Sequence, residues 1–183
     1  MSGFLFAFIA CLLASLGARD QLLVAQMSAR QGQRPGLLIV ALFSAFATTA
    51  LAAWLATVMA AQVPGKAKLV FAGIALVLAG GEALLLAARK PPAEPTNSLF
   101  AALVVLAAQQ LTDAVRFLVL ALALLTASPI TAGMGGAASG VIGLGAAWMM
   151  PEIATQKQLP MLRRLAGVFL LAAGIMLGWR GMS

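Results

Sequence analysis

Two polar clusters interrupt long apolar stretches of this chain and carry its candidate chemistry. The first cluster is Arg19, Asp20 and Gln21, and the second consists of Gln109, Gln110, Thr112, Asp113 and Arg116. Carboxylate, amide and hydroxyl oxygens bind protons or hard cations, and guanidinium groups neutralise carboxylates. A charged side chain at the centre of a membrane span costs about 2.5–3.5 kcal/mol on insertion scales. We therefore expect both clusters to face the interior of a helix bundle.

The composition explains why such charges need a protein interior. Of the 183 residues, 62% are hydrophobic and only 9% are charged, a balance typical of a multi-pass membrane protein. In such a protein the net charge of +7 indicates basic loops and lipid headgroups, not nucleic acid. Histidine and tyrosine are absent and Cys11 is the single cysteine, so we expect neither an enzyme, nor a cofactor, nor an intramolecular disulfide.

The elements that must position the clusters are predicted to be transmembrane helices. Each unpaired peptide group in lipid costs several kcal/mol, and the apolar runs are too long for barrel strands, so the fold class is all-α. Runs of apolar residues separated by charge, proline and glycine predict six helices. Their approximate ranges are 3–28, 36–61, 67–88, 98–126, 130–150 and 161–180.

The two halves of the chain resemble each other. Trp54 recurs as Trp148, and the stretch AGIALVLAG from Ala72 recurs as AGVFLLAAG from Ala166, both at an offset of 94 residues. Because three spans are an odd number, two copies must insert in opposite directions. The sequence predicts one membrane domain made of two inverted three-helix repeats, 1–92 and 93–183, with the working site where they meet.

Loop charge predicts the orientation. With these helix ranges, loops one, three and five carry seven basic residues, against three in the other loops and the C-terminus. This bias places both chain termini outside a bacterial-type inner membrane. The seven basic residues are Arg30, Arg34, Arg89, Lys90, Lys157, Arg163 and Arg164.

The buried charges have two predicted pairings. Arg19 pairs with Asp113 and Asp20 with Arg116 across the repeats, or Asp113 pairs with Arg116 at i, i+3. Either arrangement gives a neutral network without a ligand. Glu82, in the third helix, is a secondary candidate that reaches a neighbouring helix or binds a proton.

Residues 15–21, SLGARDQ, and 110–116, QLTDAVR, resemble a repeated motif of the cation/proton exchanger family of transmembrane protein 165. That motif is Glu-x-Gly-Asp-Lys/Arg-Ser/Thr, usually followed by Gln, once in helix one and once in helix four. Gly17, Arg19 and Gln21 match in the first copy; Asp113 matches in the second, and Gln110 is the amide of the expected Glu. The resemblance implies proton-coupled export of manganese or calcium, with Asp113 as a metal ligand.

The chain keeps only one of the four carboxylates in that motif pair. In a continuous helix Asp20 would lie about 200° from position 18 and would point away from the site. Neutral oxygens come from Ser15, Gln21 and the amides and hydroxyl of the second cluster.

Three functions remain open. The first is a cation exporter of altered selectivity, with Asp113 exchanging the proton or ion. The second is a non-transporting membrane protein with a self-paired charged core. The third is an amino-acid-type exporter whose Asp and Arg side chains hold a zwitterion. The expected partners are the lipid bilayer, a divalent cation, a proton and a second copy of the chain in a homodimer.

Overall fold

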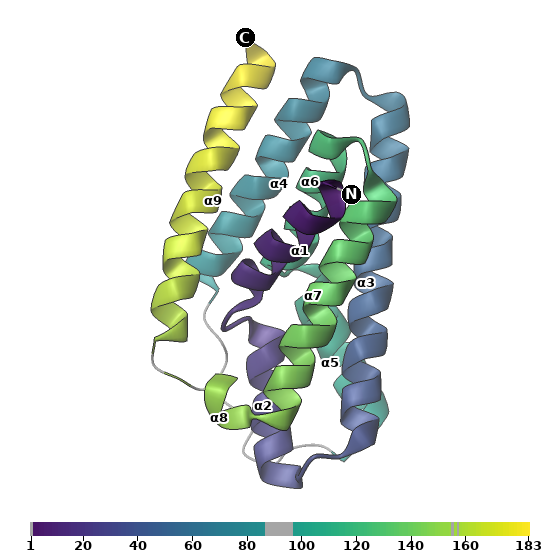
Figure 1. Cartoon of the computed structure of the whole chain (residues 1–183), viewed down its shortest axis with the longest axis vertical. Coiled ribbons are helices and arrows are strands. Elements are labelled where there is room, and N and C mark those ends of the chain that lie inside the picture. The colour runs from purple at the N-terminus through teal and green to yellow at the C-terminus, as the bar shows by residue number, and fades with distance from the viewer. Residues whose placement is uncertain (1, 87–96, 155, 157) are drawn as a thin grey trace.

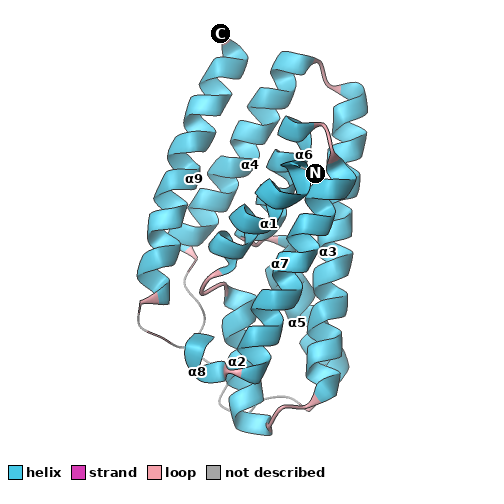
Figure 2. Ribbon diagram, viewed as in Figure 1, coloured by secondary structure: helices cyan, strands magenta, loops and turns pink. Residues whose placement is uncertain are grey.

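Helices form every regular element in the part of the chain that the structure describes. The computed structural model describes residues 2–86, 97–154, 156 and 158–183. Figures 1 and 2 show an elongated bundle whose helices run mainly along its long axis. The helices are α1 Ser2–Ser15, α2 Arg19–Gln31, α3 Pro35–Gln62, α4 Gly65–Leu85, α5 Leu99–Leu111, α6 Ala114–Thr126, α7 Pro129–Met149, α8 Pro151–Ala154 and α9 Leu159–Met182.

The bundle has four to six segments that are long and apolar enough to cross a membrane. Helices α3, α4, α7 and α9 each meet this criterion alone. The pair α1 and α2 is bent by 59° at a short break, and the pair α5 and α6 is bent by 48°. The predictions of an all-α, multi-pass membrane protein are confirmed. The expected continuous helices 3–28 and 98–126 are wrong, because each is broken in its middle.

The first break follows from a residue that leaves helical geometry. Gly17 has φ +71°, in the left-handed region that glycine adopts without the steric cost of a Cβ. At the second break, the side chain of Asp113 accepts a hydrogen bond from the backbone N–H of Val115 and thereby caps α6. Elsewhere helices start at prolines, with Pro35 opening α3 and Pro129 opening α7, where the missing N–H costs nothing.

The two broken pairs run in opposite directions along the bundle. In Figure 1 the chain passes down through α1 and α2, whereas it rises through α5 and α6. Both labelled chain ends lie toward the same end of the molecule. The two half-helices that follow the breaks, α2 and α6, are each 13 residues long.

Helices α4 and α9 pack together through glycines. A Cβ on Gly73 would lie 2.7 Å from the carbonyl oxygen of Gly174, and a Cβ on Gly80 would lie 2.6 Å from that of Gly167. The position along α4 rises as the position along α9 falls, so the two helices are antiparallel. Small residues at this spacing let two backbones approach closely in a membrane.

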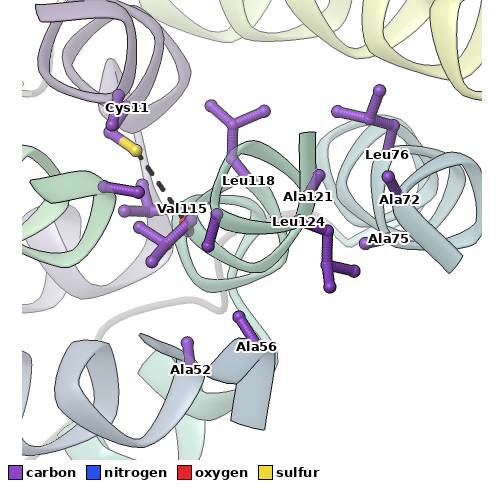
Figure 3. Packing of buried hydrophobic residues seen from close by; sticks show 14 of the residues in the cluster. Cys11, Ala52, Ala56, Ala72, Ala75, Leu76, Val115, Leu118, Ala121 and Leu124 are labelled. Atoms are coloured by element: carbon purple, nitrogen blue, oxygen red, sulfur yellow. Dashed lines mark hydrogen bonds between the residues drawn. The ribbon is translucent and has the colours of Figure 1, made fainter. Parts of the chain in front are cut away.

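Helix α6 lies within the main apolar core. Its Leu118, Val119 and Ala121 are at most 2% exposed, and the thiol of Cys11 on α1 contacts the carbonyl oxygen of Val115 at 3.9 Å (Figure 3). Helix α7 approaches α1 closely, because a Cβ on Gly135 would lie 2.5 Å from the carbonyl oxygen of Phe4. The glycines of α7 therefore serve close packing around the half-helices.

Large apolar side chains cover the outside of the bundle. Phe43, Trp54, Phe100, Phe169 and Trp179 are each more than 60% exposed. Exposure of such apolar side chains to water is unfavourable, whereas contact with lipid tails is not. The polar residues described next are buried, which is the reverse of a soluble protein.

Candidate functional site at the two helix breaks

Asp20 lies at the first break, in the first turn of α2. It is 5% exposed, and its Oδ1 accepts a hydrogen bond from the backbone N–H of Gln21 at 2.8 Å. The N-terminal end of a helix carries a partial positive charge, which favours a carboxylate there. The break thus creates a helix start inside the bundle and places a buried negative charge on it.

Asp113 lies at the second break, where it caps α6. Its Oδ2 accepts from the N–H of Val115 at 3.3 Å and lies 3.5 Å from Nη1 of Arg116. Nε of Arg116 donates to Oγ1 of Thr48 on α3 at 2.9 Å. This is the local i, i+3 pairing, and it is buried on both sides.

Gln110 joins the two breaks. Its Nε2 donates to Oδ2 of Asp20 at 3.1 Å, and its Oε1 accepts from the hydroxyl of Ser44 at 2.6 Å. Its backbone oxygen accepts from the N–H of Asp113 at 3.2 Å. Gln110 is 0% exposed, so the carboxylate of Asp20 and the backbone N–H of Asp113 lie on one buried hydrogen-bonded chain that crosses from α2 to α5 and the start of α6.

The expectation that Asp20 points away from this site is wrong. The rotation argument assumed one continuous helix through residues 15–21, but the chain leaves helical geometry at Gly17. Asp20 therefore starts a new half-helix and faces Gln110. The bend, and not the helical periodicity, decides its direction.

Glu82 of α4 binds two arginines. Its Oε1 lies 2.8 Å from Nε of Arg19 and 2.5 Å from Nη2 of Arg163 on α9. The expected cross-pairs of Arg19 with Asp113 and of Asp20 with Arg116 do not form. Arg19 forms its ion pair with Glu82 of α4 and not with Asp113. Arg89, the other charge near Glu82 in sequence, lies outside the described residues.

The same two arginines bind backbone carbonyls at the breaks. Nη1 of Arg163 donates to the oxygen of Gly17 at 2.9 Å, and Nη2 of Arg19 donates to the oxygen of Thr112 at 3.3 Å. Carbonyls at the C-terminal end of a helix lack intrahelical donors and carry a partial negative charge. Each half-helix end, α1 and α5, is thus closed by a guanidinium from a different helix.

The remaining predicted residues lie around this network. Ser15 is buried and its hydroxyl donates to the oxygen of Leu12 at 2.8 Å, within its own helix. Gln21 is buried against α7, because its amide is the group that a Cβ on Gly143 would meet. Gln109 is partly exposed, and the exposed Thr112 accepts from Arg19 at 3.1 Å.

Sequence reasoning missed three members of the network. Ser44 and Thr48 lie one turn apart on α3 and bind Gln110 and Arg116. Arg163 was counted as a loop residue in the charge bias, but it is 5% exposed within α9. No local signal separates it from the exposed Arg164 beside it, because its partner Glu82 is 81 positions away.

Several buried polar atoms have no hydrogen-bond partner among the described residues. Buried polar groups in proteins are nearly always paired, with protein or with water, so such atoms mark where water or a ligand is accommodated. Two of them, Oδ1 of Asp113 and Nη2 of Arg116, belong to one ion pair. The full set is Oε2 of Glu82, Oε1 of Gln109, Oδ1 of Asp113, Nη2 of Arg116 and Nε of Arg163.

The network balances three carboxylates against three guanidiniums. Over the described chain, no group of three or more His, Cys, Asp or Glu side chains is placed to hold a metal ion. Comparisons of the chain with protein families, characterised proteins and solved structures return no match.

Proposed function

We propose that this protein is a membrane carrier that exchanges a cation for a proton by alternating access. In this proposal two inverted three-helix repeats, 1–92 and 93–183, move against each other around the buried carboxylates Asp20 and Asp113. Manganese and calcium are the cations that the family resemblance implies. Proton exchange requires a carboxylate that is shielded from lipid and reachable from either side.

The packing of α4 on α9 supports the inverted repeat. At the offset of 94 residues, Gly73 corresponds to Gly167 and Gly80 corresponds to Gly174. The contact between Gly73 and Gly174 therefore becomes, after exchange of the repeats, the contact between Gly167 and Gly80, which is also present. A twofold axis between the two antiparallel helices has this property.

The observation that carries the proposal is the meeting of two helix breaks at one buried polar chain. Broken helices cost backbone hydrogen bonds, and in membranes they persist where they serve a site inside the protein. Many secondary transporters place substrate and coupling ions at such breaks, at the interface of two repeats. Here Gln110 binds Asp20 from the first break and Asp113 from the second.

Reconstituted vesicles test the proposal. Purified protein is incorporated in liposomes that enclose a pH-sensitive dye, and an outward or inward cation gradient is applied. We expect cation-driven proton flux that is lost in Asp20→Asn. It is also lost in Asp113→Asn, because that change leaves the buried guanidinium of Arg116 without its carboxylate. It is retained in Glu152→Gln, which changes an exposed carboxylate on α8. Unchanged flux in both aspartate variants, or the same flux in protein-free liposomes, contradicts the proposal.

A second candidate follows from the balanced charges. The three ion pairs join two carboxylates to three guanidiniums, and the buried Asp20 supplies the third negative charge, so the network as a whole has no net charge. Such a balanced core also describes a non-transporting protein stabilised by its own salt bridges. In that case Arg19→Leu with Arg116→Leu misfolds the protein, and no cation moves protons in the wild type. Proton flux driven by amino acids and not by metals selects the third function, a zwitterion exporter.

A further inference from the structure

We infer that the site takes one positive charge at Asp20, so that its cargo is a monovalent cation, and that Arg116 sets this selectivity. The inference rests on the proposed function and narrows its substrate class. It departs from the divalent ions that the resemblance implies. Its basis is the unequal distribution of the buried charges among the described residues.

The three buried carboxylates differ in their cationic partners. Glu82 has two, Arg19 and Arg163, and Asp113 has one, Arg116. Asp20 has none within 4.0 Å in the described part of the chain; it accepts hydrogen bonds from the neutral N–H of Gln21 and the amide of Gln110. The negative charge that remains to be neutralised locally is therefore that of Asp20.

A buried carboxylate held only by neutral donors favours one added positive charge. Desolvation of an isolated ionised group costs several kcal/mol in a protein, and a proton or a monovalent cation removes that cost. Because the three carboxylates and three guanidiniums already balance, a monovalent cation brings the network to one excess positive charge and a divalent cation to two. The divalent ion is therefore repelled more strongly in a weakly polarisable interior. Divalent sites in proteins offset this with several carboxylates.

Neutral oxygens lie on the same hydrogen-bonded chain as Asp20. The hydroxyl of Ser44 and the side-chain oxygen of Gln110 are joined at 2.6 Å, and the amide of Gln110 contacts Asp20. An independent sign of a ligand is Oδ1 of Asp113, which has no partner although the side chain is 4% exposed. Nη2 of Arg116 is also without a hydrogen-bond partner among the described residues.

The exchange step is balanced one for one. For each proton that leaves the site for the aqueous phase, one monovalent cation binds at the carboxylate of Asp20. The charge of the site is the same before and after, so transport is electroneutral. The other charged groups of the buried network are Arg19 on α2, Glu82 on α4, Asp113 and Arg116 at the start of α6, and Arg163 on α9.

Arg116 keeps the second carboxylate out of the exchange. Its guanidinium neutralises Asp113 and is anchored to Thr48, so the site offers one free negative charge and not two. Removing the guanidinium charge leaves two buried carboxylates without a cationic partner, Asp20 and Asp113, on either side of Gln110. Two carboxylates with amide and hydroxyl oxygens suit a hard divalent ion.

Vesicle assays with lithium, sodium, potassium, manganese and calcium chlorides test this selectivity. We expect proton flux with a monovalent ion in the wild type, no membrane potential from it, and a manganese response lower by about tenfold or more. Arg116→Gln should raise the manganese-to-monovalent ratio by about tenfold, whereas Arg116→Lys, which keeps the charge, should not. Binding of radioactive manganese to the same variants in detergent gives a second readout.

The outcomes separate the two proposals. Proton flux that is faster with manganese or calcium than with every monovalent ion in the wild type overturns the inference and leaves carrier function intact. An unchanged ratio in folded Arg116→Gln also overturns it. If Arg116→Gln does not fold, two other results decide whether the cargo is monovalent. These are the manganese-to-monovalent flux ratio of the wild type and the loss of monovalent flux in Asp20→Asn. No flux with any cation in the wild type defeats the proposed function itself.

Discussion

Nη1 of Arg163 donates a hydrogen bond to the carbonyl oxygen of Gly17 at 2.9 Å, across 146 positions of sequence. The same guanidinium binds Glu82, which also binds Arg19, which in turn binds the oxygen of Thr112. One carboxylate on α4 therefore connects the carbonyl ends of both broken helices. Glu82 and Arg163 hold the breaks in position without lying on the Asp20–Gln110 chain.

Arg163→Met should destabilise the protein by about 3–5 kcal/mol, the usual cost of removing one partner of a buried ion pair. The change leaves the oxygen of Gly17 unpaired and Glu82 with one arginine. Cys11 reports unfolding, because it is the only cysteine and is 0% exposed, so maleimide labelling on heating follows its release. Arg164→Met, at the exposed neighbouring position, is the control. Equal labelling curves for the two variants contradict a structural role for Arg163.

Gly80→Ala should weaken the packing of α4 on α9, whereas Gly81→Ala should not. A Cβ at position 80 would lie 2.6 Å from the backbone oxygen of Gly167, but at position 81 nothing lies within 4 Å. Overpacking of this kind costs about 1–3 kcal/mol. The midpoint of maleimide labelling at Cys11 measures the difference between the two variants. A midpoint for Gly80→Ala at or above that of Gly81→Ala would show that the two backbones separate without cost.

Hydropathy predicted the spans but not their breaks. Long apolar runs and proline or glycine boundaries located the starts of α3 and α7 within one residue. The breaks fall within runs that stay apolar on both sides, so hydropathy does not detect them. Gly17 and the helix-capping residue Asp113 were visible signals, but glycine and aspartate inside a span are also compatible with an unbroken helix.

The sequence predicted most residues of the site, but not which arginine pairs with which carboxylate. Gln110 and Asp113 were expected at one site, whereas the helical rotation placed Asp20 away from it. In the structure the side-chain amide of Gln110 binds the carboxylate of Asp20, and its backbone oxygen binds the N–H of Asp113. Which arginine binds which carboxylate depends on distances between helices that are far apart in sequence. Glu82 on α4 forms ion pairs with both Arg19 on α2 and Arg163 on α9. The second pair is possible because α4 and α9 pack closely through their glycines.

Gly143→Ala should alter transport without loss of stability. A Cβ at position 143 would collide with the side-chain amide of Gln21, which is the flexible end of a side chain and can move. The displaced amide lies next to Asp20 in sequence, so we expect a change in the apparent affinity for the cation. Gly145→Ala, where nothing lies within 4 Å of the added Cβ, is the matched control. Equal apparent affinities for the two variants would exclude Gln21 from the ion pathway.

Gln110→Glu tests how the number of carboxylates at the breaks controls the cargo. The added carboxyl group keeps an acceptor for Ser44 but replaces the donor that binds Asp20. Two adjacent carboxyl groups either share a proton or bind a cation of higher charge, because like charges in contact do not both remain free. We therefore expect stronger manganese-driven proton flux than in the wild type, even with Arg116 in place. Gln110→Met, of similar size and without hydrogen-bonding groups, should lower flux with every cation. Equal flux in these two variants would mean that the bridge between the breaks takes no part in ion selection.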